Sequence, residues 1–252
     1  MKKDRFKFKG SQSHELAAEF DYPDDGPDKY AVFAHCFTCN KNFKSINTIS
    51  KTLTDNGYGV FRFDFTGLGE SAGDFSETNF STNVRDLLAA AEYMSGNYGS
   101  PQLLIGHSMG GAAVLYAGSR IESVTAVVTI GAPYQVSHLA DILKSSEEES
   151  ERKGYSNVII AGQKFTLKKH FFDDLRGHDM NEPISGLSKP LLIMHSPIDK
   201  TVSIKEAAKI FAAARHPKSF ISLDKADHLM SGEKDALYTG KIAAVWASGY
   251  VD

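Results

Sequence analysis

The chain has 252 residues, of which 42% are hydrophobic and 23% charged, and its formal net charge is −3 at pH 7. This composition is typical of a soluble globular protein, and we expect a single domain over residues 1–252. The small net charge argues against binding to nucleic acid or to a membrane surface. The basic start is not followed by an apolar segment, and no apolar run approaches about 18 residues, so we expect a cytoplasmic protein without a membrane span.

Strands and helices alternate along most of the chain. Two short strands are expected at residues 5–9 and 15–20, joined by a turn, as an antiparallel edge. Further strands are expected at 29–37, 59–65, 102–106, 124–133, 190–196 and 218–223, and helices within 42–57, 79–99, 112–120, 203–215 and 232–249. The middle strands are apolar on both faces, which is typical of a mainly parallel sheet covered by helices on both sides. The sequence therefore predicts the α/β fold class.

Residues 135–188 interrupt this alternation, and we interpret them as a cap insertion within the single domain. They contain a charged segment that predicts an exposed helix, and a stretch that predicts a hairpin turning at Ala161-Gly162. The insertion leaves the carboxyl edge of the sheet, so it should lie over the catalytic loops and select the substrate. Its candidate apolar wall residues are Leu139, Ile142, Leu143, Phe165, Phe171 and Phe172. We expect Phe171 and Phe172 to bind substrate; the alternative for each is packing of the cap onto the body.

The stretch "GHSMG", residues 106–110, places Ser108 between a predicted strand and a predicted helix. A G-x-S-x-G pattern in that setting predicts a sharp turn that exposes the serine hydroxyl above the sheet. The alternative is that Ser108 only caps the following helix. We interpret Ser108 as a nucleophile, and we expect the side chain of the neighbouring His107 to point away from it.

A serine hydroxyl needs a base, and the base needs a group that holds its tautomer. His228 lies in a loop just after a predicted strand, where a side chain can reach over the sheet edge. Asp199 follows another predicted strand and lies between the serine and the histidine in chain order, as such an acid should. Asp224 and Asp227 are rivals that lie closer to His228 in the sequence. We predict the triad Ser108, Asp199 and His228.

The developing oxyanion requires backbone N–H donors. One should come from Met109, directly after the nucleophile and at the start of a helix. The other should come from the loop after the strand ending near His35, and Phe37 is the candidate.

These segments together resemble α/β-hydrolase-fold serine hydrolases of the esterase and lipase type. Members often have His-Gly before the oxyanion residue, where this chain has His35-Cys36. The stretch "FDFTGLGES" is similar to the aspartate–G-x-G-x-S loop of many of these enzymes, which implies that Asp64 and Ser71 brace the oxyanion loop and do not react.

Four stretches resemble a narrower group: "FAHCFTC", "RFDFTGLGES", "DFSETNFSTNV" and "ARHPKSFISLDKADHL". They are similar to the hydrolase module of bacterial proteins that fuse an α/β-hydrolase to an OsmC-like domain. The resemblance implies an OsmC-like partner domain, which this chain does not include.

Cys36 and Cys39 are the only two cysteines, so we expect no disulfide framework. A C-x-x-C pattern after a strand and before a helix also suggests a thiol redox protein or a redox switch, because a helix N-terminus lowers a thiol pKa. The alternative is two small, partly buried apolar residues that shape the oxyanion loop. We favour the alternative because a redox protein needs no serine elbow. A non-catalytic binding protein typically lacks one of the three triad groups, and all three are present.

The sequence thus predicts a serine esterase that cleaves carboxylic esters of short to medium acyl or aryl type through an acyl-enzyme. A small-molecule ester is the only partner that this chemistry requires, and no metal or organic cofactor is implied. The same triad also serves thioesterases, amidases and perhydrolases, so the reaction type is better defined than the substrate.

Overall fold

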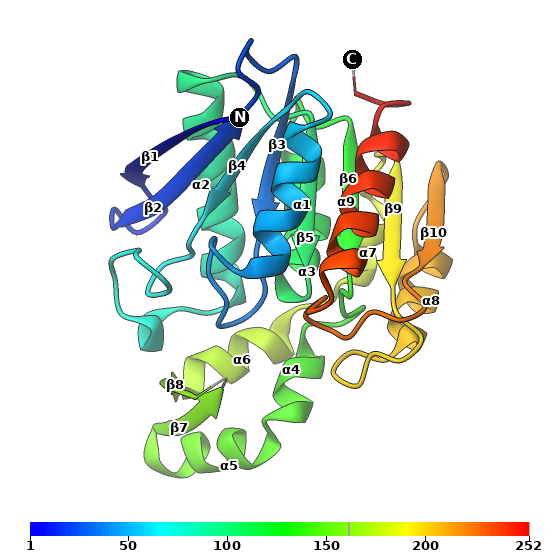
Figure 1. Cartoon of the computed structure of the whole chain (residues 1–252). Helices are drawn as coiled ribbons and strands as arrows, with labels where there is room; N and C mark the ends of the chain where they lie inside the picture. Colours follow the sequence, from blue (N-terminus) through cyan, green and yellow to red (C-terminus); the bar gives the residue numbers. More distant parts are fainter. Residues whose placement is uncertain (161, 252) are drawn as a thin grey trace.

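The computed structural model describes residues 1–160 and 162–251, and within them eight strands form one sheet (Figure 1). The strand order is β1-β2-β4-β3-β5-β6-β9-β10. The strands are β1 (Lys2–Lys9), β2 (Glu15–Tyr22), β3 (Lys29–Ala34), β4 (Tyr58–Phe63), β5 (Leu103–His107), β6 (Ala126–Ile130), β9 (Leu191–His195) and β10 (Lys218–Ser222). The β1–β2 and β2–β4 pairs are antiparallel and the remaining pairs are parallel, which confirms the predicted mainly parallel sheet with an antiparallel edge.

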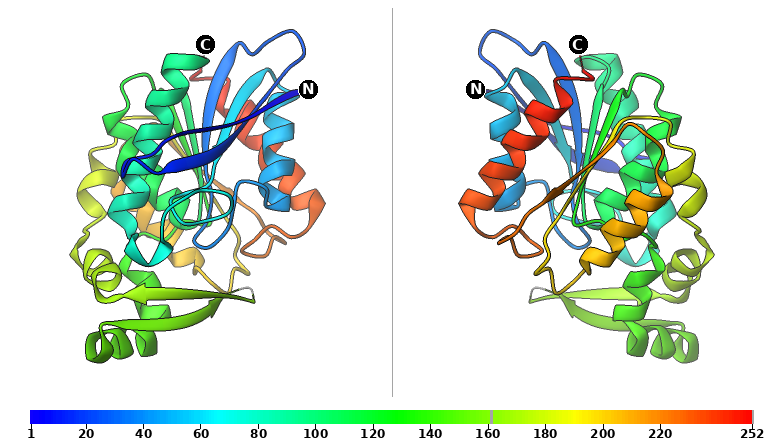
Figure 2. Two further views of the ribbon diagram at one scale, coloured as in Figure 1. Left: turned by 90° about the vertical axis from the view of Figure 1, so that its left-hand side faces the viewer. Right: turned by 90° about the vertical axis from the view of Figure 1, so that its right-hand side faces the viewer.

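Helices cover both faces of this sheet (Figure 2). One face carries α1 (Lys44–Thr54) and α9 (Glu233–Ala247), and the other carries α2 (Phe80–Asn97), α3 (Met109–Ala117) and α8 (Ile204–Ala213). Short 3-10 helices lie at Phe75–Glu77 (η1) and Gly118–Arg120 (η2). Side chains of a strand alternate between the two helix layers. In β5, Leu103 and Ile105 pack in the α1 and α9 layer, whereas Leu104 packs in the α2 and α3 layer.

The segment interpreted as a cap projects below the sheet in Figure 1. It contains α4 (Ser137–Ile142), α5 (Lys144–Lys153), β7 (Tyr155–Ile160), β8 (Gln163–Lys168), α6 (Lys169–Gly177) and α7 (Asn181–Ser185). Strands β7 and β8 pair in an antiparallel hairpin, as the sequence predicts. Of its predicted turn residues, Ala161 lies outside the described residues. Helix α7 contacts α3 and α8, α6 contacts α2, and β8 contacts η1, so these three elements attach the segment to the rest of the domain.

The helices of the described residues include none that is long and apolar enough to cross a membrane.

Candidate active site

Ser108 occupies a sharp turn between β5 and α3. Its backbone angles are φ 54° and ψ −120°, a conformation that costs an L-residue on the order of 1–3 kcal/mol and requires support from its surroundings. Part of that support is the hydrogen bond from the Ser108 amide to the carbonyl of Ile130, at 2.8 Å. A Cβ atom at Gly110 would lie 2.2 Å from the carbonyl oxygen of Ala34, so only glycine fits there. The Ser108 side chain makes no capping bond to α3, so the capping alternative is wrong.

The three predicted triad side chains meet at the carboxyl edge of the sheet. The Ser108 hydroxyl lies 3.1 Å from Nε2 of His228, and Nδ1 of His228 lies 2.7 Å from Oδ2 of Asp199. The other carboxylate oxygen of Asp199 accepts bonds from the backbone amides of Thr201 and Val202, at 2.8 and 2.9 Å. Both ring nitrogens of His228 therefore have the partners that a serine nucleophile requires.

The two rival carboxylates bind other groups. Asp224 accepts a hydrogen bond from the Ser222 hydroxyl, and Asp227 accepts one from the Ser231 amide. Neither side chain contacts the ring of His228 through a hydrogen bond in the described residues, so Asp199 is the acid that orients it.

Hydrogen bonding keeps Asp199 ionised. Burial by itself would raise the pKa of this carboxyl, but the bonds from His228 and from the Val202 and Thr201 amides outweigh it and hold the pKa below its usual range. The carboxylate beside Nδ1 of His228 is thus negatively charged, as the acid of a serine–histidine–aspartate triad must be.

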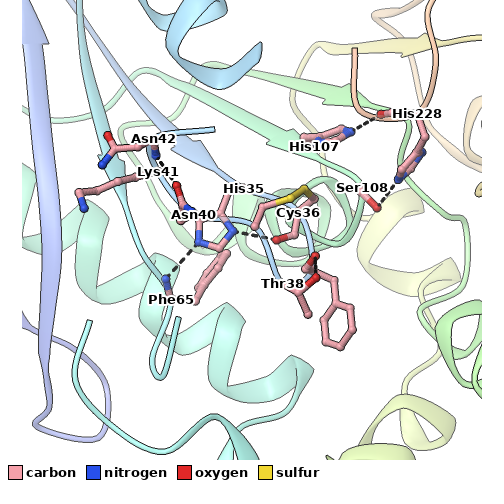
Figure 3. The surroundings of a disulfide bond; sticks show 12 residues. His35, Cys36, Thr38, Asn40, Lys41, Asn42, Phe65, His107, Ser108 and His228 are labelled. Atoms are coloured by element: carbon pink, nitrogen blue, oxygen red, sulfur yellow. Dashed lines mark hydrogen bonds between the residues drawn. A yellow bond between two sulfur atoms is a disulfide. The ribbon is translucent and has the colours of Figure 1, made fainter. Parts of the chain in front are cut away.

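His107 points away from Ser108, as predicted, and supports the loop that carries His228 (Figure 3). Its Nε2 lies 2.7 Å from the backbone carbonyl oxygen of His228 and donates to it. Burial lowers the pKa of His107 to about 3, so its ring is neutral at physiological pH.

The predicted oxyanion donors lie around the same space as Ser108. Phe37 and Met109 line one cavity with Ser108 and His228. In the described residues, neither backbone amide donates a hydrogen bond to another group. The loop behind Phe37 is fixed by the buried His35, whose Nδ1 donates to the Cys36 carbonyl at 2.8 Å and whose Nε2 accepts from the Phe65 amide at 3.3 Å.

Asp64 and Ser71 brace this region from below and do not reach the triad. Asp64 accepts bonds from the backbone amide and the ammonium of Lys41, at 2.6 and 2.9 Å, and from the Glu70 amide at 2.9 Å. The Ser71 hydroxyl donates to the Asp64 carbonyl at 2.6 Å and accepts from the Ala17 amide at 2.9 Å. Lys41 is fully buried and also pairs with Glu70, a role for which the sequence offers no signal.

Cys36 and Cys39 form a disulfide, so the interpretation as two separate apolar residues is wrong. The physical reason is a tight turn: the Cys39 amide donates to the Cys36 carbonyl at 3.1 Å and brings the two Cα atoms to 5.3 Å, within the usual range for a disulfide.

The cavity at Ser108 has a volume of about 410 Å³ and a mainly apolar wall. Part of the wall comes from the triad loops and the disulfide loop, and part from the predicted cap. The apolar side chains around it are Phe37, Phe43, Met109, Pro133, Leu139, Ile142, Leu143, Ile160, Val202 and Leu229. Three of the predicted wall residues, Leu139, Ile142 and Leu143, are among them.

The other predicted wall residues do not line this cavity, and the prediction that Phe171 and Phe172 bind substrate directly is wrong. Both are buried on α6, with Leu175, on the side that packs into the core. Phe171 packs behind Phe37, with 5.6 Å between the ring centres. A large aromatic residue in an inserted helix cannot be assigned to cavity or core from the sequence, since both environments favour it.

A second serine–histidine–aspartate cluster joins α2 to α6. The Ser81 hydroxyl lies 2.5 Å from Oδ1 of Asp174 and 2.9 Å from Nε2 of His178. The closest approach of Asp174 to His178 is to the same Nε2, at 3.5 Å. In a catalytic triad the serine and the acid contact opposite ring nitrogens of the histidine. Here Ser81 and Asp174 both contact Nε2 of His178, so this cluster lacks the arrangement of a catalytic triad.

The fold and the site together define an α/β-hydrolase-fold hydrolase. Residues 27–152, half of the chain, match the family described as Hydrolase_4, serine aminopeptidase, S33, and the chain belongs to this family.

The chain is similar to the esterase domain of a Rhodothermus marinus protein, with 42% identity over 99% of both chains and a TM-score of 0.80. It is also similar to the uncharacterized protein YfhR of Salmonella typhi, with 27% identity over 74% of this chain and 61% of that protein. The rat mitochondrial palmitoyl-protein thioesterase ABHD10 is 23% identical over 83% of this chain and 72% of its own length. An accompanying OsmC-like domain stays a prediction.

The neutral state of buried His107 predicts a loss of stability in acid. Below a pH of about 6.5 the unfolded chain protonates this histidine and the folded chain does not, down to about pH 3. The unfolded state then binds more protons, so the free energy of unfolding should fall as the pH decreases through this window, by about 1.4 kcal/mol per pH unit for this group.

Denaturant unfolding between pH 4 and 7 measures this slope. His107→Gln keeps an N–H donor without titrating, so its slope should be shallower than that of the wild type by about that amount. The same change at exposed His14 is the control for replacing a histidine by glutamine. Parallel curves for His107→Gln and the wild type would contradict the assignment.

Proposed function

We propose that this protein is a serine esterase that hydrolyses carboxylic esters of short to medium acyl or aryl type through an acyl-enzyme on Ser108. The observation that carries the proposal is the continuous line from Asp199 through His228 to Ser108 at an apolar cavity. The 42% identity to an esterase domain over almost the whole chain supports the same class of reaction.

In the proposed mechanism, His228 takes the proton of Ser108 as the hydroxyl attacks the ester carbonyl carbon. The oxygen of the tetrahedral intermediate lies between the amides of Phe37 and Met109, which stabilise its negative charge. His228 then gives the proton to the leaving alcohol, and the acyl group stays on Ser108. Water, activated by the same histidine, releases the acid and restores the serine. Asp199 holds the tautomer of His228 in both halves of the cycle.

The wall of the cavity favours an apolar substrate. Its lining includes aliphatic groups from α4 and the β7–β8 hairpin, and no Asp, Glu, Lys or Arg side chain lines it in the described residues. A carbohydrate or nucleotide would leave its polar groups unpaired on such a wall. Thioesters are a second candidate class, favoured by the similarity to the palmitoyl-protein thioesterase ABHD10.

A chain-length profile tests the substrate class. We expect p-nitrophenyl acetate, butyrate and hexanoate to be better substrates than palmitate. Leu139→Trp should fill part of the cavity and lower kcat/KM for hexanoate about 10-fold or more relative to acetate. The matched control is Ile159→Trp, at an exposed position of β7 that does not line the cavity. An unchanged profile in Leu139→Trp, or palmitate as the best substrate, would refute the proposed substrate class.

A further inference from the structure

The Cys36–Cys39 disulfide forms part of the wall of the cavity that holds Ser108 (Figure 3). Cys36 is only 4% exposed, whereas Cys39 is half-buried, and both line the cavity. A molecule that enters the cavity can therefore reach the disulfide, and Cys39 is the more exposed of the two residues.

The disulfide closes a turn that its own sequence does not favour. Thr38, at the tip of the turn, has a φ of 61°, in the left-handed region that β-branched residues avoid. Inside the turn, the Thr38 hydroxyl donates to the Phe37 carbonyl at 2.7 Å. The covalent bond thus helps to hold a strained conformation, and the Phe37 amide lies within the closed ring.

The chain on either side of this turn is fixed independently of the disulfide. His35 donates to the Cys36 carbonyl, and Lys41 is tied to Asp64. The buried Arg62 donates to the Lys41 carbonyl and pairs with Asp21. Loss of the disulfide should therefore loosen the turn at 36–39 and leave the fold intact.

We propose that Cys36–Cys39 is a thiol-reactive site whose substrate is a small thiol admitted by the cavity. The thiolate attacks the sulfur of Cys39 and forms a mixed disulfide, while the Cys36–Cys39 bond breaks and its electron pair leaves on Cys36, which takes a proton. A second thiolate attacks the sulfur of the bound thiol, the bond between that sulfur and Cys39 breaks, and a small disulfide is released. The electron pair of the broken bond leaves on Cys39, which takes a proton. Two thiols are oxidised and one protein disulfide is reduced.

Reduction should slow the hydrolysis at Ser108. Without the covalent closure, the turn can relax from the left-handed conformation of Thr38 and move the Phe37 amide. Removal of one oxyanion donor costs about 10²–10³ in kcat in other enzymes, and a donor that is displaced for part of the time should cost about 10-fold. This consequence rests on the proposed function, whereas the thiol reaction does not.

The experiment treats the full chain with 2-mercaptoethanol, or with a thiol-terminated polyethylene glycol that is too large for the cavity. Alkylation with iodoacetamide, followed by intact-mass measurement, counts the thiols that form. We expect two alkylated cysteines with the small thiol, at a rate at least 10-fold above that with the large one. In Cys36→Ser, the remaining Cys39 should form a mixed disulfide with oxidised 2-mercaptoethanol. Equal rates for the two thiols, or no alkylation, would overturn the proposal.

The second readout is the hydrolysis of p-nitrophenyl acetate before reduction, after it and after reoxidation. We expect reduction to lower the rate of hydrolysis about 10-fold and reoxidation to restore it. The double variant Cys36→Ser/Cys39→Ser should hydrolyse the ester at the rate of the reduced wild type, and the thiol should not change that rate. Alkylation without a change in rate would overturn the link to Ser108. A protein that never hydrolyses the ester would refute the proposed function, while the alkylation arm would still decide the thiol reaction.

Discussion

Ser108→Ala should lower kcat for p-nitrophenyl acetate by about 10³-fold or more, while the protein stays folded. The hydroxyl that bonds to Nε2 of His228 is lost, and no other serine in the described residues bonds to that histidine ring. Triad knockouts in other serine hydrolases have effects of this size or larger. Alanine adopts the backbone conformation of Ser108 no worse than serine does, so we expect the melting temperature to change by only a few degrees.

Ser81→Ala is the matched control, because Ser81 also contacts a histidine and an aspartate but lies on α2, away from the cavity at Ser108. Its esterase activity should stay within about two-fold of the wild type. Loss of activity in Ser81→Ala with retention in Ser108→Ala would reverse the assignment of the nucleophile.

Asp199→Asn should lower kcat by about 10³–10⁴-fold through the tautomer of His228. The amides of Thr201 and Val202 donate to Oδ1, so the oxygen of an asparagine side chain should take that place. Its NH2 group would then face Nδ1 of His228, which would have to accept. The remaining ring proton would lie on Nε2, where it blocks the transfer from Ser108.

Steady-state kinetics on one ester measures this effect. The control is Asp227→Asn, which makes the same aspartate-to-asparagine change at another position near His228. Asp227 binds the Ser231 amide and not the His228 ring, so its variant should keep activity within a few-fold. A loss below about 10-fold in Asp199→Asn would show that His228 is oriented by another group.

The sequence predicts the fold well, and it selects three proposed triad residues whose side chains the structure brings together. Both results follow from local patterns. Apolar strands separated by helical periodicity predict the parallel sheet, and the strand–turn–helix setting of Ser108 predicts the elbow. Asp199 and His228 could be chosen because each follows a strand, and parallel strands bring their carboxyl ends to one edge.

Contacts that depend on side-chain direction could not be predicted in this way. Whether Phe171 and Phe172 face the cavity or the core depends on how α6 is rotated about its axis. The sequence of the inserted segment does not define that rotation. The Cys36–Cys39 bond depends on a turn with a positive φ at Thr38, which a β-branched residue does not suggest. The buried pairing of Lys41 with Asp64 joins residues that only the folded sheet brings together.

The most direct test of the central claim is peptide mapping by mass spectrometry after treatment with a fluorophosphonate, which reacts covalently with an activated serine. We expect one adduct per chain, on Ser108, and no adduct in Ser108→Ala. The rate of labelling should also fall in Asp199→Asn, because His228 then cannot accept the serine proton. An adduct on Ser81 or on another residue, or labelling of Ser108→Ala at the rate of the wild type, would contradict the account.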